Sequence, residues 1–553
     1  MSPRALWLLL STFAAVLSLS CLLMREAIAL DPGATPEDTR IVSQWRGGER
    51  VRRSVLREAG APLPSACEGC SRVVERIVDR APLLFHDPLL LSISVVAGRD
   101  GLAAHLGERS VYLTPTDLLA AGASTGVKRF GILRLRIGFD RGGRVLDLAA
   151  RELGVSRKRL LQQGRLERFL VRREDPGGVT WPRELGPRDV TPARLAESIG
   201  AAARQLAATV REDGRYVYQI DVRTGRPGNG YSWPRHAGAT YFLAEAAHFT
   251  GDSDVAAAAR RAARHLRERA TRRCGEHRCI GRGRHVDVGS SALALLAYVE
   301  LVRHGLDPSL SPEVEALAAF LRSMQRPDGE LMHRYDRKRR RPQDVQLPYY
   351  TGEAAFALAR AHRITGDARD LQAARDALAY LVRESWSFFG SRYFFGAEHW
   401  TCQALEELWQ RAPDPVALRF CLDYHAFNRH VQFQPENPLG PYDGGYGPNP
   451  FFPPRLTSAS SRSEAAVATL ATAAAAGEPP GEVRALERQV RRSLAFIMRY
   501  QLMPGPTWLM ADPARVRGGV PGSPVDLTVR NDFTQHAGSA MLRFARYLQG
   551  SSS

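Results

Sequence analysis

Two kinds of apolar pattern alternate along the last two-thirds of the chain, from about residue 190 to residue 549. One kind has apolar residues on a single helical face and Arg and Glu on the other, as surface helices have. The other kind is almost entirely Ala, Gly and Leu, which is typical of a helix buried on most sides. We expect amphipathic helices at residues 191–210, 253–270, 312–325, 368–385, 415–430 and 481–502, each followed by one apolar helix.

The six apolar segments begin alike, at residues 236, 287, 350, 399, 461 and 536. The first, Arg235-His236-Ala237-Gly238, returns in the last as Gln535-His536-Ala537-Gly538. Such a repeat predicts an array of helical hairpins. Links after the apolar segments are short, as in Thr250-Gly251-Asp252, where Gly ends one helix and Asp caps the next. Links before them are long and rich in aromatic residues and Asp, so in a closed ring all the long links would share one rim.

This arrangement resembles the (α/α)6 toroid of the six-hairpin glycosidase superfamily, which also includes polysaccharide lyases and sugar epimerases. The resemblance covers residues 190–549 and rests on architecture and repeat rather than on a family signature. It implies a mainly α fold with its site on the rim that carries the long loops. Terpene cyclases have a related toroid, and residues 320–329 are similar to their repeats, but Glu330-Leu331 replaces the expected Gly-Trp. The zinc-binding Cys and His pattern of lanthionine cyclases is also missing from the sequence.

A small α+β domain is predicted before the toroid, at residues 83–175. Residues 89–96, 110–113 and 130–138 have strand patterns, while residues 145–153 and 156–169 have helical ones. Thr114-Pro115 is a good helix start, with Thr as the cap and Pro in the first turn. Residues 30–82 are polar, with Pro and Gly, and we expect them to form a partly disordered lead-in. Pro-Gly and Trp-Pro pairs between residues 175 and 187 mark the domain boundary.

The first 29 residues have the pattern of a signal peptide or a membrane anchor. An apolar run from residue 5 to residue 24 follows Arg4, and Ala27-Ile28-Ala29 offers the small residues that a signal peptidase requires. The run is also long enough to span a membrane without cleavage, and Cys21 leaves a lipoprotein as a third alternative. We therefore expect an exported protein that is periplasmic, secreted or anchored to the outer side of the membrane, with membrane contact only through this segment.

The remaining cysteines suit an oxidising compartment. Six follow Cys21, an even number that favours disulfides, and Cys274 and Cys279 lie close together in a charged loop. The pairing of the others stays open. Cys67-Glu68-Gly69-Cys70 has the spacing of a redox dithiol, but no thioredoxin-like pattern surrounds it, so structural disulfides or free thiols are favoured.

The net charge is +18 and comes almost wholly from arginine, because Lys128, Lys158 and Lys338 are the only lysines. A solvated basic surface is one interpretation. A field that concentrates acidic ligands is the other. The sequence has no zinc-finger spacing and no strand with the aromatic and basic signature of RNA-binding domains, so no nucleic-acid partner is expected. An acidic glycan fits the charge better than DNA.

Histidines are the first candidates for catalysis. His236, His399 and His536 share one repeat position at the starts of apolar helices, where the helices of a toroid converge. Histidine exchanges protons near neutral pH, so two of them could remove and return a proton, as an epimerase or a lyase requires. Alternatively, buried histidines tie loop carbonyls to helix starts. No metal site is expected, because a wide funnel would keep these residues apart.

Carboxylates offer a second chemistry. Glu353 and Glu464 share a repeat position, and Asp287 starts another apolar helix. Hydrolysis of a glycosidic bond requires two carboxyl groups, one protonated and one ionised. Ordinary stabilisation of a helix start by a first-turn acid is the alternative for each. The expected substrate-binding residues are Trp233, Arg235, Tyr349, Tyr350, Tyr442, Asp443, Arg462 and Gln535, whose aromatic, charged and amide side chains suit a sugar.

These patterns together predict an exported carbohydrate-active enzyme, a glycoside hydrolase, lyase or epimerase, that acts on an acidic oligosaccharide or polysaccharide. The alternative is a non-catalytic envelope protein that binds a glycan or a partner. No cofactor is expected, because the sequence has neither a phosphate-binding glycine loop nor a metal-binding motif. An isoprenoid cyclase would need an apolar funnel, against which the polar helix starts argue.

Overall fold

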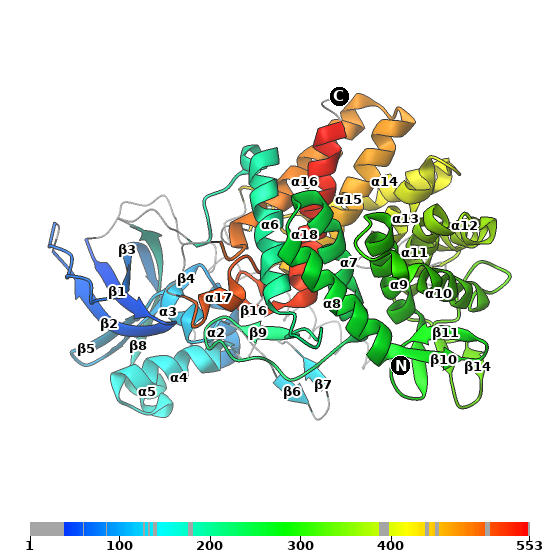
Figure 1. Cartoon of the computed structure of the whole chain (residues 1–553). Coiled ribbons are helices and arrows are strands. Elements are labelled where there is room, and N and C mark those ends of the chain that lie inside the picture. The colour runs from blue at the N-terminus through cyan, green and yellow to red at the C-terminus, as the bar shows by residue number, and fades with distance from the viewer. Residues whose placement is uncertain are drawn as a thin grey trace, which may run out of the picture.

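The computed structural model describes residues 38–58, 60–83, 86–124, 128–130, 133–135, 141–174, 181–385, 398–436, 442–447, 453–503 and 509–550. The predicted signal or anchor segment and Cys21 lie outside these residues. Figure 1 shows two parts, a sheet domain in blue and cyan and a helical ring in green to red. In the described part of the chain, no helix is both long and apolar enough to cross a membrane.

The sheet domain is built on six antiparallel strands in the order β2-β1-β3-β8-β4-β5. The strands are β1 (Arg40–Arg46), β2 (Glu49–Leu56), β3 (Ser71–Pro82), β4 (Asp100–Leu106), β5 (Arg109–Leu113) and β8 (Arg165–Arg173). Its helices are α2 (Pro88–Ser94), α3 (Pro115–Ala120), α4 (Arg141–Leu153) and α5 (Arg157–Gln163), and a short hairpin joins β6 (Lys128–Phe130) to β7 (Leu133–Leu135). The predicted cap at Thr114 is confirmed, since its side chain accepts a hydrogen bond from the backbone of Asp117.

Three predictions for this domain are wrong. Residues 40–82 are not a loose lead-in but strands β1 to β3, and the polar look of β2 arises because Arg50 and Arg53 pair with Asp117 and Glu152. Residues 89–96 form helix α2 rather than a strand, because a short apolar run carries no period that separates the two. The helix predicted at 156–169 ends at Gln163, and strand β8 follows Gly164. The strand predicted at 130–138 lies partly outside the described residues.

The ring consists of alternating outer and inner helices, as predicted. The outer helices are α6 (Pro192–Ala208), α8 (Ser253–Ala270), α10 (Ser311–Ser323), α12 (Ala368–Arg383), α14 (Pro415–His430) and α16 (Pro480–Tyr500). The inner helices are α7 (Trp233–Thr250), α9 (Val288–Arg303), α11 (Tyr350–Thr365), α13 (His399–Trp409), α15 (Leu456–Ala476) and α18 (Asn531–Gly550). Each inner helix packs against the next, and α18 packs against α7, which closes the ring into an (α/α)6 toroid.

The two kinds of link differ as the sequence predicts. Gly251 and Gly366 end inner helices with φ of 69° and 64°, and Asp252 and Asp367 cap the outer helices that follow. The long links carry small sheets made by β9 (Gln219–Asp221), β10 (Thr271–Cys274), β11 (His277–Ile280), β12 (His285–Asp287), β13 (Arg334–Asp336), β14 (Arg341–Gln343), β15 (Pro521–Ser523) and β16 (Asp526–Arg530). Short helical turns η2 (Pro187–Asp189), η3 (Pro308–Leu310) and α17 (Pro513–Val516) complete the connections. Because β16 pairs with β9, the last long link is joined to the first.

Disulfides join the six cysteines of the described residues into three pairs: Cys67 with Cys70, Cys274 with Cys279, and Cys402 with Cys421. The third pair links inner helix α13 to outer helix α14. Each such bond reduces the conformational freedom of the unfolded chain and so stabilises the fold.

The sheet domain packs directly on the toroid. Trp45, Val73, Ala97 and Leu119 belong to the same continuous apolar core as the ring helices. A hydrogen bond also joins the two parts, since the Tyr442 hydroxyl donates to the carbonyl oxygen of Ala97 at 2.7 Å. The sheet domain therefore forms one body with the ring.

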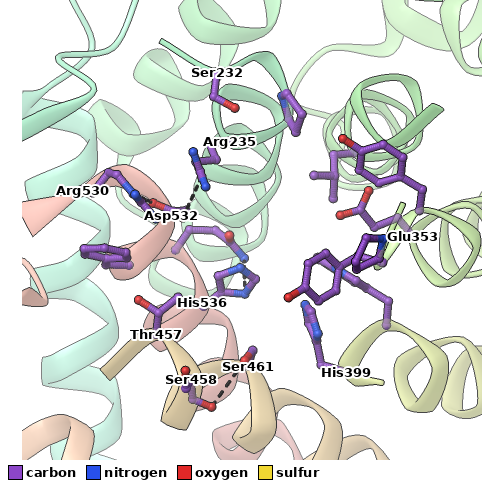
Figure 2. Close-up of a pocket in the computed structure, with 18 of the residues that line it drawn as sticks. Ser232, Arg235, Glu353, His399, Thr457, Ser458, Ser461, Arg530, Asp532 and His536 are labelled. Atoms are coloured by element: carbon purple, nitrogen blue, oxygen red, sulfur yellow. Dashed lines mark hydrogen bonds and ion pairs between the residues drawn. The ribbon is translucent and has the colours of Figure 1, made fainter. Parts of the chain in front are cut away.

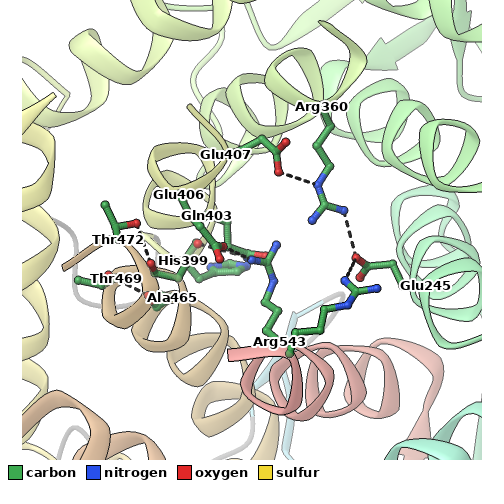
Figure 3. Close-up of polar contacts among 12 residues, drawn as sticks. Glu245, Arg360, His399, Gln403, Glu406, Glu407, Ala465, Thr469, Thr472 and Arg543 are labelled. Atoms are coloured by element: carbon green, nitrogen blue, oxygen red, sulfur yellow. Dashed lines mark hydrogen bonds and ion pairs between the residues drawn. The ribbon is translucent and has the colours of Figure 1, made fainter. Parts of the chain in front are cut away.

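A buried charge network fills the end of the ring opposite the long loops (Figure 3). Arg360 of α11 donates to Glu245 of α7, Glu300 of α9 and Glu407 of α13, at 3.2, 2.8 and 3.2 Å. Figure 3 shows the contacts with Glu245 and Glu407. Burial alone would raise the pKa of Glu245, but Arg360 and Arg546 outweigh it and keep the pKa of that carboxyl below its usual range. One guanidinium thus holds three inner helices to a fourth.

Replacing Arg360 with leucine should destabilise the toroid strongly, because three buried carboxylates would lose their shared cation. We expect a loss of about 3 to 5 kcal/mol, which lowers the melting temperature by roughly 3 to 5 °C in a thermal unfolding experiment. The matched control is Arg369→Leu, which removes an exposed arginine on the next helix and should leave the melting temperature nearly unchanged. Equal effects of the two substitutions would contradict the central role of the network.

Candidate active site

A cavity of about 640 Å³ opens at the N-terminal ends of the inner helices, on the rim that carries the long loops (Figure 2). Helices α7, α11, α13, α15 and α18 each contribute first-turn residues to its wall, while α9 contributes Leu293. Residues that the sequence singled out line it: Arg235, Tyr349, Tyr350, Glu353, His399, Arg462, Gln535 and His536.

The repeated glycines explain why these helix starts converge so closely. A Cβ on Gly538 would overlap the ring of Phe242, and one on Gly352 would lie 2.9 Å from Cβ of Trp400. A Cβ on Gly289 would overlap the carboxyl group of Glu353. Glycine at these positions allows neighbouring helix starts to approach, so the sequence repeat is first of all a packing requirement.

Two histidines lie side by side at one end of the cavity. The rings of His399 and His536 meet edge to face with centroids 5.5 Å apart. Nδ1 of His536 lies 2.7 Å from Oε2 of Glu464, a buried carboxylate behind it. Within the described residues, Nδ1 of His399 has no hydrogen-bond partner. The pair therefore has one imidazole backed by an acid and one without such support.

Their surroundings shift the two imidazoles in opposite directions. Burial, assisted by the positive charge of His536 and Arg462, lowers the pKa of His399 well below its usual range. Burial acts to lower the pKa of His536 too, but the contact with Glu464 outweighs it and raises that pKa. Two adjacent groups whose pKa values diverge suit a base and an acid, with neutral His399 as the base and protonated His536 as the acid.

The expectation that a wide funnel keeps the three histidines apart is wrong for His399 and His536. One ligand atom from each of His399, Glu464 and His536 lies within 4.8 Å of the other two, and the described residues contain no other such group. This spacing would let the three side chains converge on a divalent ion such as zinc. In the present arrangement, however, His536 and Glu464 are hydrogen-bonded to each other.

Glu353 and two tyrosines form the wall contributed by α11. Burial raises the pKa of the Glu353 carboxyl to about 8, so this side chain holds a proton at neutral pH. Tyr349, the residue before the helix, has φ of 82°, a left-handed conformation that is costly for a residue other than glycine. Its ring contacts His399 with centroids 5.5 Å apart. A strained aromatic residue beside a candidate base is typical of a functional site.

Arginines give the cavity a positive surplus. Among the described lining residues are Arg235, Arg455, Arg462 and Arg530, against the acids Glu353 and Asp532. Asp532 is shared by Arg235 and Arg530, at 2.9 and 2.8 Å. Arg455 is exposed at the edge of the cavity. An acidic ligand would therefore meet more positive than negative charge here.

Six predicted residues do not line the cavity: Glu464, which lies behind His536, and the five that follow. His236 is fully buried, 2.6 Å from the Tyr231 hydroxyl and 2.8 Å from the carbonyl oxygen of Ala262, so the alternative interpretation, a tie between loop and helix, applies to it. Trp233 packs on His236 and His265. Asp287 pairs with Arg334, Asp443 pairs with Arg492, and Tyr442 binds the sheet domain.

Sequence reasoning missed Arg455, Thr457, Ser458, Arg530, Asp532 and Phe533, which also line the cavity. Helices α15 and α18 begin at Leu456 and Asn531, more than one turn before the repeat positions Ser461 and His536. The polar character of the residues just before each repeat position is the sequence feature that could have revealed these cavity residues.

Comparison with known proteins finds similarity in structure alone. No protein-family model matches the sequence, and no curated protein matches it either. A solved D-mannose isomerase has a TM-score of 0.50 and 13% identity over 65% of this chain and 98% of its own. A sugar epimerase from a ruminal bacterium has a TM-score of 0.50 and 10% identity over 64% of this chain and 98% of its own. These similarities establish the six-hairpin toroid fold that the sequence resemblance implied.

Replacing Glu464 with glutamine should lower the pKa of His536, because burial would then be opposed only by the smaller attraction of Asp532, which Arg235 counteracts. NMR titration of the histidine side chains would measure this change. The His265 signal should not shift, because this ring lies apart from the cavity and bonds the carbonyl oxygen of Asp213. A His536 pKa that stays raised in the variant would contradict the role given to Glu464.

Proposed function

We propose that this protein is an exported carbohydrate-active enzyme that epimerises an acidic sugar within an oligosaccharide or polysaccharide. The observation that carries the proposal is the contact between His399 and His536 at one end of an open cavity, with Glu464 behind His536 alone. His399 would take a proton from the carbon next to the sugar carboxylate, and His536, whose ring stands edge-on to that of His399, would supply a proton to the opposite face of that carbon.

The cavity wall supports a sugar substrate. Tyr349, Tyr350 and Trp400 present aromatic surface beside polar side chains, a combination that suits the apolar faces and hydroxyls of a sugar ring. The two similar solved structures, a D-mannose isomerase and a sugar epimerase, agree with this class of substrate.

The arginines support an acidic substrate. Arg235, Arg455, Arg462 and Arg530 exceed the lining acids in number within the described part of the wall. Positive charge would bind the carboxylate of a uronate and would also make the neighbouring carbon more acidic. The N-terminal sequence and the three disulfides support export, because such bonds persist in oxidising compartments.

Hydrolysis has less support. It requires two carboxyl groups on either side of one bond. Glu353 and Asp532 are the lining carboxyl groups among the described residues, and Asp532 is occupied by Arg235 and Arg530. A lyase would use the same proton abstraction as an epimerase, so only the product separates those two.

In D2O the purified protein should introduce deuterium next to the carboxylate of a uronate-containing oligosaccharide, because protons on His399 and His536 exchange with solvent. Proton NMR would follow the loss of the signal from the hydrogen on that carbon. His399→Asn and His536→Asn should each slow the exchange by about 100-fold or more. The matched control is His285→Asn, an exposed histidine of β12 that should exchange at the wild-type rate.

Each of four other outcomes would contradict the proposal in a different way. New reducing ends would indicate hydrolysis, and unsaturated sugar signals would indicate a lyase. Exchange that a chelator abolishes and zinc restores would assign the histidines to a metal. Unchanged spectra across a panel of acidic and neutral glycans would favour the non-catalytic binding protein.

Arg455→Gln should raise KM for the acidic substrate about threefold to fivefold and leave kcat nearly unchanged, because an exposed arginine contributes weak attraction to the ligand. The effect should shrink in high salt, which screens exposed charges. Steady-state kinetics with the neutral sugar of the same ring size provide the control, since its KM should not change. An equal rise for both sugars would argue against recognition of charge.

A further inference from the structure

Glu353 stands apart from the histidines and is not used by the mechanism above. It belongs to the first turn of α11 and lines the cavity, yet only 6% of its surface is exposed. Its Oε2 atom has no hydrogen-bond partner in the part of the chain that the structure describes. A buried carboxyl oxygen without a partner is costly, so a purely structural glutamate would be expected to have one.

The fold makes room for this carboxyl group. Position 289, at the start of α9, is glycine, and any Cβ there would overlap Oε2 of Glu353. The neighbouring arginines do not neutralise the carboxyl group: Arg235 and Arg530 bind Asp532, while Arg462 binds Asn428 and the carbonyl oxygen of Ser458. The side chain is therefore packed in place but not paired.

We propose that Glu353 is a further catalytic residue, a neutral acid that donates a hydrogen bond to the substrate oxygen on which negative charge develops when His399 removes the proton. This inference rests on the proposed function, because it assigns a role within the same reaction. The oxygen belongs to the sugar carboxylate, which the arginines would bind on its other side.

The step is balanced without any other reagent. The C–H bond breaks, the proton moves to His399, and the electron pair moves onto the adjacent carboxylate, whose oxygen is held by the O–H of Glu353. The electron pair then returns to carbon, which takes a proton from His536. Glu353 keeps its proton throughout, as a hydrogen-bond donor in a site shielded from water should.

The environment favours the protonated form. Burial is the cause that raises the pKa of Glu353 to about 8. The titratable groups near it are Tyr349 and Tyr350 at its own helix start and, beyond Tyr350, Asp287 at the end of β12, which is paired with Arg334. His399 of α13 shares the cavity and is neutral by the shift described above. As pH rises through about 8, Glu353 would ionise and the hydrogen bond would be lost.

Two substitutions separate a neutral donor from an ionised base or nucleophile. Glu353→Gln keeps an N–H donor of the same length and should retain deuterium exchange within about tenfold of wild type. It should also lose the fall in rate that wild type shows above about pH 8. Glu353→Ala removes the donor and should slow exchange by about 100-fold or more. The readouts are the pH profile and rate of exchange, with circular dichroism to confirm folding.

Other outcomes would overturn the proposal. A folded Glu353→Gln protein as slow as Glu353→Ala would mean that an ionised carboxylate is required. Wild-type rates and pH profiles for both variants would mean that Glu353 is structural.

A second measurement does not depend on turnover. The infrared difference spectrum between wild type and Glu353→Gln should show a protonated carboxyl group at pH 7 that ionises near pH 8. An ionised carboxylate at pH 7 would overturn the proposal even if exchange occurs. A protonated carboxyl with no exchange by the wild-type protein on any acidic sugar would overturn the assigned catalytic role together with the epimerase function.

Discussion

The ion network around Arg360 is the constraint on which the ring geometry depends. The attraction between buried charges offsets the cost of removing them from water only when their geometry is good. Arg360 therefore constrains how the helices that it joins rotate about their axes. Helix α11 carries Arg360 at one end and Glu353 at the other. Helix α13 likewise carries Glu407 at one end and His399 at the other. The charged end of the ring therefore constrains where the cavity-lining side chains of the opposite end meet.

The ring could be predicted from sequence because its information is local and repeated. The helical period recurs in every hairpin, Gly ends and Asp caps mark links such as those at Gly251-Asp252 and Gly366-Asp367, and four of the six inner helices begin within three residues of their repeat positions. The site followed in part: His399, His536 and Glu353 do share a cavity, and Glu464 reaches it through His536. His236 has the same repeat position but does not line the cavity. Its ring is hydrogen-bonded to the Tyr231 hydroxyl and to the carbonyl oxygen of Ala262, and the sequence repeat does not reveal these contacts.

The sheet domain shows where such reasoning stops. Strand β2 is polar because its arginines are matched by acids on α3 and α4, 64 to 102 residues further along the chain, which composition cannot disclose. Helix α2 lies in an apolar run too short to show a period. Tyr442 had the features of a sugar-binding residue, yet its hydroxyl joins the two domains. For β2 and for Tyr442, the residues that explain the structure are distant in sequence.

At Tyr349 the backbone conformation favours glycine, whereas the cavity wall contains the tyrosine side chain. Glycine would adopt its φ of 82° without strain and would be favoured by any selection for thermal resistance alone. The same change would remove the ring that lies against His399 and open that wall of the cavity. Tyrosine there is thus a residue that the backbone conformation disfavours and whose ring completes the cavity wall, so under the proposed function a change to glycine would gain stability and weaken the site.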